Sequence, residues 1–289
     1  MGKLRDLMLM EMELRNFRPK TIECYLWHMK SFTKLQGRSP AEIGEQEIRH
    51  YLHYLKKERH TSWSNINQAY AALKFFYVHT LHRAWDVDKI PRPKGEHRLP
   101  QVLSQQEVTR FLDATSNFKY RVIFMTIYSG GLRLSEAAHL KIADIDKDRM
   151  QIRINQGKGN KDRYTLLGKR SLDILRLYWK RYRPKDLLFP STIRKGQPID
   201  STGVQKAFRE ALSKTTIRKK ATVHTLRHSF ATHLLEAGTE IPYIQNLLGH
   251  SDSRTTSICL HVARKQILKV VSPIDLIDKE AEKTKQPKG

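Results

Sequence analysis

Five basic side chains stand beside glycine breaks or helix starts in four short stretches of the sequence. Arg133 follows a double glycine in SGGLRLSE, and Lys158 lies between two glycines in QGKGNKD. His224 and Arg227 are three residues apart at the expected helix start HTLRHSF, so both project from one face. His250 stands in LLGHSD. Two arginines, a lysine and two histidines, with no carboxylate cluster to hold a metal, suit a single phosphodiester group.

These side-chain types predict metal-free phosphoryl transfer. Arginine forks bind the non-bridging oxygens in pairs, histidines donate and move protons, and a lysine on a hairpin can protonate a leaving alkoxide. Each residue also has a plainer interpretation: a surface ion pair of Arg133 with Glu136, a turn lysine, a helix cap and a loop histidine. The spacing of an ATP-binding phosphate loop is absent. We expect no cofactor and no metal ion, and the set still lacks a nucleophile.

The charge of the chain predicts a polyanionic partner. Its 289 residues include 53 Lys and Arg against 29 Asp and Glu, a formal net charge of +24. Neutralising phosphates releases counterions and drives binding, so we expect nucleic acid. A basic but otherwise ordinary surface is the alternative. The basic residues are spread along the whole chain, which disfavours a membrane surface.

The remaining composition indicates a globular chain. No apolar run approaches the roughly 18 residues of a membrane span, and the first residues lack the pattern of a secretory signal. Cys24 and Cys259, far apart in sequence, form neither a disulfide framework nor a zinc site. We therefore expect a cytoplasmic protein.

The hydrophobic pattern predicts a mainly α fold with a small β-hairpin or sheet in the second of two domains. Apolar residues recur at helical spacing in 19–35, 39–58 and 64–82, and Ser39 with Pro40 resembles a helix start. Three prolines, a glycine and many charges in 86–101 mark an extended connection. We expect a helical domain at 1–90, a linker at 91–101 and a second domain at 102–289.

The second domain is expected to begin with a capped helix. Ser104 and Glu107 form a capping-box pattern, and an apolar helix then runs to the Gly130-Gly131 break. Residues 150–167 alternate like two strands about a Gly-Lys-Gly-Asn turn. The later helical segments are 171–182, 201–212, 225–238, 241–249 and 253–262.

The motifs SGGLRLSE, QGKGNKDR, HTLRHSFATHLLEAG, IPYIQNLLGHS and TTSICLHV, in this order, resemble the tyrosine recombinases, also called phage-type integrases. The resemblance is closest to Xer-type and integron-type integrases and covers nearly the whole chain. It implies a two-domain clamp on duplex DNA, with a helical core-binding (SAM-like) domain and a mixed α/β catalytic domain. The residues it implies for the phosphate-activating pocket are Arg133, Lys158, His224, Arg227 and His250, with Glu136 in support.

In that family a tyrosine attacks the scissile phosphate, which gives a 3′-phosphotyrosyl link and a free 5′-hydroxyl, without a cofactor. The tyrosine follows the second histidine by nine residues, and here that position holds Cys259. Three explanations stand open: an engineered or accidental substitution, a natural chain that binds but does not cut, or chemistry by the thiol or another nucleophile. Tyr243 is the other candidate nucleophile, although its apolar neighbours predict a core position. We expect DNA binding to survive and strand cleavage to fall.

The resemblance also implies the partners. They are double-stranded recombination sites and three further copies of the chain, in a tetramer that exchanges a C-terminal segment between neighbours. The segment Ile267–Ile277 is apolar enough for that exchange, or for packing within its own subunit. The host would be a bacterial or archaeal cell, with the protein on its nucleoid or serving a mobile element. A non-enzymatic DNA-binding protein and a type IB topoisomerase are the alternatives.

Overall fold

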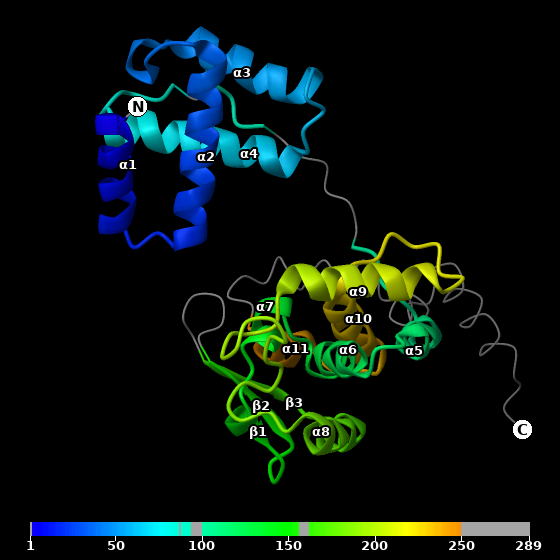
Figure 1. Ribbon diagram of the computed structural model, residues 1–289. Helices are drawn as coiled ribbons and strands as arrows, with labels where there is room; N and C mark the ends of the chain where they lie inside the picture. The colour runs from blue at the N-terminus through cyan, green and yellow to red at the C-terminus, as the bar shows by residue number, and fades with distance from the viewer. Residues whose placement is uncertain (1, 87, 94–99, 156–161, 250–289) are drawn as a thin grey trace, which may run out of the picture. The chain divides into compact units, whose positions relative to one another are not determined.

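The computed structural model describes residues 2–86, 88–93, 100–155 and 162–249 (Figure 1). The chain divides into two compact units, Met1–His97 and Arg98–Gly289, and each is described by itself. Among the described residues, no helix has the length and apolar content needed to cross a bilayer.

The regular elements described in the first unit are all helices or helical turns. Its elements are α1 (Gly2–Leu14), α2 (Pro19–Gln36), the 3-10 turn η1 (Pro40–Glu42), α3 (Glu45–Lys57), α4 (Trp63–Phe75) and the π-helical turn η2 (Phe76–Thr80). Helix α2 packs along α4, and α1 and α3 close the bundle. Phe32, Leu73 and Met12 are fully buried between them. The unit therefore has a hydrophobic core of its own.

The helix expected to start at Ser39 begins six residues later. The Ser39 hydroxyl accepts a hydrogen bond from the Ala41 amide, but it caps only η1. Helix α3 starts at Glu45 because the Glu47 carboxylate accepts the Gly44 amide at 3.2 Å. The Glu47 bond therefore starts a second, separate helix, and the Ser-Pro signal marks only the short turn before it.

The second unit gathers its helices around α6. Its elements are α5 (Gln105–Ala114), α6 (Phe118–Gly130), α7 (Leu134–Ala138), η3 (Ile142–Asp144), β1 (Ile145–Asp146), β2 (Gln151–Ile154), β3 (Arg163–Leu166), α8 (Lys169–Tyr182), α9 (Ser201–Ser213), α10 (Val223–Glu236) and α11 (Ile241–Leu248). Helix α6 contacts five helices and β3, and its Val122, Phe124 and Ile127 are fully buried. The expected capping box is confirmed: Ser104 and Glu107 bond each other's backbone amides at 3.2 and 2.7 Å.

The strands form a three-stranded antiparallel sheet in the order β1-β2-β3. Strands β2 and β3 are the expected hairpin, with Ile152 opposite Thr165 and Ile154 opposite Arg163. Strand β1 adds two residues that the sequence pattern did not indicate, because two residues are too short to show alternation. The hairpin tip, 156–161, lies outside the described residues. The expected mainly α fold with a small sheet is confirmed.

Candidate active site

Gly131 sets the direction in which the chain leaves α6. It ends the helix in a left-handed conformation, with φ of 60°, which glycine adopts without a steric penalty. A Cβ at this position would lie 2.4 Å from a ring carbon of Phe230 in α10. Only glycine therefore fits, and the turn leads directly to Arg133, the N-cap residue of α7.

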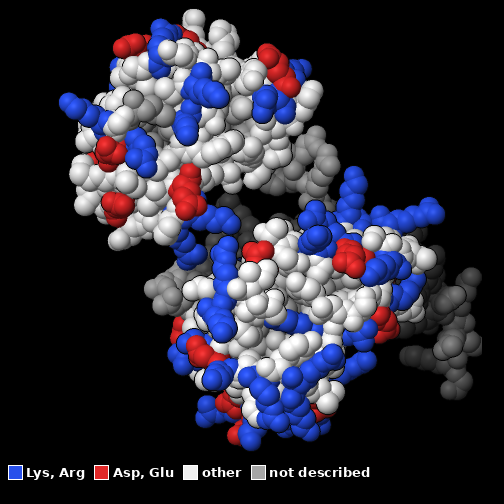
Figure 2. All heavy atoms as spheres, viewed as in Figure 1, with Lys and Arg blue, Asp and Glu red and all other residues white. Residues whose placement is uncertain are grey.

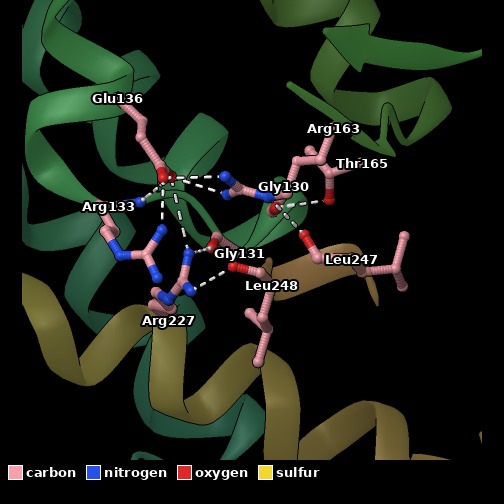
Figure 3. Close-up of polar contacts among 9 residues, drawn as sticks. All are labelled: Gly130, Gly131, Arg133, Glu136, Arg163, Thr165, Arg227, Leu247 and Leu248. Atoms are coloured by element: carbon pink, nitrogen blue, oxygen red, sulfur yellow. Dashed lines mark hydrogen bonds and ion pairs between the residues drawn. The ribbon is translucent and has the colours of Figure 1, made fainter. Parts of the chain in front are cut away.

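Glu136 in α7 holds three arginines from three parts of the second unit (Figure 3). Its carboxylate accepts the Arg133 amide at 2.7 Å and the Arg133 guanidinium at 2.6 Å. Arg163, at the start of β3, donates a hydrogen bond from each Nη atom to one carboxylate oxygen of Glu136, at 2.9 and 2.8 Å. Arg227 in α10 lies 3.6 Å from the same carboxylate. We call these four residues the Glu136 cluster; it carries three positive charges and one negative charge.

The electrostatics of the Glu136 cluster favour an ionised carboxylate. Burial acts to raise the pKa of Glu136, but the hydrogen bonds and charge of Arg163, together with the hydrogen bonds of Arg133, lower the pKa to about 2. The side chains of Glu136, Arg163 and Arg227 are less than a tenth exposed, while that of Arg133 is 19% exposed. The excess positive charge of the cluster therefore meets solvent through Arg133.

Two of the arginines also bind the C-terminal end of α11. Arg227 donates to the carbonyl oxygens of Gly131 and Leu248, each at 2.6 Å. Arg163 Nε donates to the Leu247 carbonyl at 2.9 Å. The last carbonyls of a helix have no partner within it, so these bonds satisfy them. The end of α11, two residues before His250 in the sequence, is thereby tied to the Glu136 cluster.

A cavity of about 580 Å³ lies beside Arg133. It is also lined by Gln205 and Arg209 of α9 and by His224 at the start of α10. Burial lowers the pKa of His224, and the charges of Arg227 and Arg133 lower it further. The pKa of the neighbouring His228, whose ring lies 5.5 Å away, falls to about 4 through burial and the charge of His224. Both rings are therefore neutral near pH 7, and each can donate or accept a hydrogen bond as an uncharged imidazole.

The structure brings together the predicted Arg133, Glu136, His224 and Arg227. Three other predicted site residues lie outside the described residues: Lys158, His250 and Cys259. The C-terminal segment 267–277 also lies outside them. Among the described residues, no group of three or more His, Cys, Asp or Glu side chains could hold a metal ion.

Two sequence interpretations need correction. Tyr243, expected in the core, is 63% exposed, because α11 buries Ile244 and Leu248 on its other side. The pairing of Arg133 with Glu136 exists, but it is partly buried, with a buried carboxylate, and is not a surface ion pair. Arg163 was not predicted as a site residue, because its polar neighbours in the sequence are typical of a solvent-exposed strand. Its signal is alternation: Arg163 faces Ile154, whose side chain is buried.

Comparison with known proteins places the chain in a family. Residues 101–266, more than half of its length, match the model of the phage integrase family. The chain belongs to the phage integrase family, that of the tyrosine recombinases. Residues 4–87 match the SAM-like N-terminal domain of phage integrases.

Relatives of this integrase cover almost its whole length. An integrase/recombinase of Sinorhizobium fredii, y4qK, is 42% identical over 97% of this chain and 91% of its own. The tyrosine recombinase XerC of Halalkalibacterium halodurans is 31% identical over 90% of this chain and 92% of its own. The crystal structure of the XerA recombinase has a TM-score of 0.52 and 27% identity, and the match covers 100% of this chain and 99% of XerA. The XerH recombinase bound to a palindromic difH substrate shares the fold, with a TM-score of 0.71 at 23% identity over 88% of this chain and 79% of XerH.

Proposed function

We propose that this integrase binds duplex DNA and holds one backbone phosphate in the cavity beside the Glu136 cluster. The observation that carries the proposal is that Arg133, through which the excess charge of the Glu136 cluster meets solvent, lines the same cavity as His224. A phosphodiester anion would neutralise that excess and accept hydrogen bonds from Arg133 and His224. Cutting and rejoining strands at specific sites is the reaction that the family implies.

The proposed roles follow from the chemistry of each group. Arg133 and Arg227 stabilise the negative charge that grows on the non-bridging oxygens, and Glu136 fixes their positions. His224 and His250 donate hydrogen bonds or move protons, and Lys158 protonates the leaving 5′ oxygen. None of these steps calls for a cofactor or a metal ion.

We propose further that Cys259 leaves this chain deficient in cleavage. An unperturbed thiol is more acidic than an unperturbed phenol, with a pKa of about 8.5 against about 10. However, the cysteine side chain is several ångströms shorter than tyrosine, and a misplacement of about 1 Å can cost roughly 100-fold in rate. Sulfur is also a soft nucleophile facing a hard phosphorus centre. DNA binding does not need this side chain, so we expect binding to remain.

The test compares the chain with its Cys259→Tyr variant on nicked suicide substrates. The DNA flanking the encoding gene, footprinted with the purified protein, supplies the substrate sequence. We expect covalent protein–DNA adducts from Cys259→Tyr at a rate at least about 100-fold above that of the cysteine form, with and without EDTA. A Cys24→Tyr variant is the matched control and should stay inactive. Equal adduct formation by the cysteine and tyrosine forms would refute the role of Cys259.

We also propose the organisation that the family resemblance implies. Residues 1–90 would form the core-binding domain, 91–101 the linker and 102–289 the catalytic domain. Four copies would assemble on paired sites by exchanging the segment 267–277. Sedimentation of the chain on paired-site DNA tests this, since deletion of 267–289 should abolish the tetramer and preserve binding to a single site.

A DNA-binding protein that never cuts is the second candidate, and Cys259 is the observation that favours it. The two candidates differ in the tyrosine variant. A variant that binds the footprinted site but forms no adduct would support the second.

A further inference from the structure

The outward side of α8 and the three residues after it carry concentrated positive charge. From Lys169 to Lys185, seven of the seventeen residues are Lys or Arg and one is Asp. Figure 2 shows Lys and Arg gathered over the part of the second unit where Figure 1 has α8. Six of the basic residues are exposed and form no ion pair with any described carboxylate: Lys169, Arg170, Lys180, Arg181, Arg183 and Lys185. We call this surface the α8 face.

The geometry of α8 separates the charges from the core. Ser171, Leu175 and Tyr178 are buried, so the helix turns the side that carries Lys169 and Lys180 toward solvent. Eleven residues of helix place those two ammonium-bearing residues about 16 Å apart along the axis. That length matches roughly five base pairs of DNA at about 3.4 Å each.

Exposed rings stand among the cations of the α8 face. The Arg183 guanidinium lies 4.4 Å from the ring centre of Trp179, and that of Arg181 lies 5.6 Å from Tyr182. Both rings are at least 40% exposed, and Leu177, two residues before Trp179, is 54% exposed. Cation–π contacts restrain guanidinium groups that would otherwise move freely, which lowers the entropy lost when they bind an anion.

The α8 face lies on a different side of α6 from the candidate active site. Ser129 of α6 bonds Ser171 of α8 at 2.6 Å, whereas the preceding Tyr128 bonds His233 of α10 at 2.8 Å. Figure 1 shows α8 well apart from α9 and α10, which line the cavity. The charges of the α8 face therefore cannot serve the phosphate held at the Glu136 cluster.

We propose that the α8 face is a second docking surface for duplex DNA, which it binds through backbone phosphates. Four cations on α8 and two directly after it, all without described carboxylate partners, complement a phosphate backbone, and releasing its counterions would drive the contact. Such contacts carry no sequence information. The α8 face would therefore bind DNA of any sequence. This DNA segment is separate from the one whose phosphate occupies the cavity.

The first experiment measures the salt dependence of binding. The probe is a labelled random duplex of about 40 base pairs, followed by anisotropy from about 50 to 200 mM salt. Each phosphate contact contributes about 0.9 to the slope of log K against log salt. Removing three charges from the α8 face should therefore lower the slope by about 2 to 3. The variant is R170Q/K180Q/R181Q. The control removes three exposed charges elsewhere on the same unit, R110Q/R194Q/K195Q, and should leave the slope unchanged.

The second experiment locates the DNA. A photo-crosslinking benzoylphenylalanine replaces Leu177 in the α8 face or, as control, Ile193, which is 92% exposed in a loop. We expect DNA adducts from position 177 and none from 193. If the unaltered protein binds DNA while the α8 variant keeps its slope and position 177 gives no adduct, the second surface is refuted and an acidic protein becomes the occupant to seek. Failure of the unaltered chain to bind any DNA would instead overturn the proposed function.

Discussion

Replacing Glu136 by Gln tests whether its charge holds the Glu136 cluster together. Glutamine keeps the shape of the side chain but removes the negative charge that three arginines face, two of them less than a tenth exposed. The fall of the Glu136 pKa from 4.5 to about 2 corresponds to about 3 kcal/mol, since a tenfold change in acidity is worth about 1.4 kcal/mol. Breaking one partner of a buried pair costs roughly 3–5 kcal/mol, which agrees. We expect the free energy of unfolding of the second unit to fall by about 3 kcal/mol.

Hydrogen–deuterium exchange of the full-length chain measures this loss, because peptides from α6, α7 and α10 report on the second unit alone. The matched control is Glu210→Gln. The Glu210 carboxylate pairs with Lys214 at 2.8 Å, but its side chain is 63% exposed, so the control should leave protection unchanged. Equal protection in the two variants would show that the Glu136 carboxylate contributes nothing to the fold.

The same carboxylate predicts a dependence on pH. A group whose pKa is lower in the folded state stabilises the protein above its unfolded pKa, and that contribution is lost as the pH falls through the folded pKa. The stability difference between the unaltered chain and Glu136→Gln should therefore be full above about pH 4.5 and shrink toward pH 2. Urea unfolding of both proteins across this range measures it, and a difference that stays constant with pH would contradict the ionised carboxylate.

Two further substitutions probe the framework of the site. Gly131→Ala forces a Cβ into Phe230 in a left-handed conformation and should cost about 2–4 kcal/mol of stability by urea unfolding. Gly196→Ala, with φ of 75° and no atom within 4 Å, should cost only about 1 kcal/mol; equal losses would refute the steric argument. Arg163→Lys keeps the charge but loses the paired bonds to Glu136, so we expect about 2 kcal/mol less stability and slower adduct formation in the tyrosine-restored protein. Unchanged stability would show that charge alone suffices.

The sequence predicted the elements whose signals are local. The Ser104 and Glu107 capping box needs only four residues, and the alternation of 150–167 needs only two strands. The helix start at Ser39 was wrong because two N-terminal signals compete within eight residues, and the Glu47 bond to Gly44 begins the longer helix. A local sequence pattern identifies both helix-start signals but does not show which of them begins the longer helix.

The site was predicted less completely, because its geometry depends on distant contacts. The motifs singled out Arg133, Glu136 and Arg227, but burial of the carboxylate could be known only from the packing of α7 against its neighbours. Arg163 makes as many hydrogen bonds to Glu136 as any described residue. However, the polar residues around it in the sequence gave no indication that its side chain is buried. Tyr243 shows the opposite error, since apolar sequence neighbours do not decide which side of a short helix is buried.

The long sequence separations within the Glu136 cluster constrain how the protein is made. Arg163 reaches a carbonyl 84 residues later, and the Arg227 bond to Gly131 spans 96 residues. Such distant closures form slowly, whereas domains near the N-terminus fold as units while synthesis continues. The first unit can bury its own core once its ninety-odd residues have left the ribosome. In a nascent chain the N-terminal unit can therefore fold well before residue 248 is synthesised. Only then can the contacts of the Glu136 cluster with α11 form.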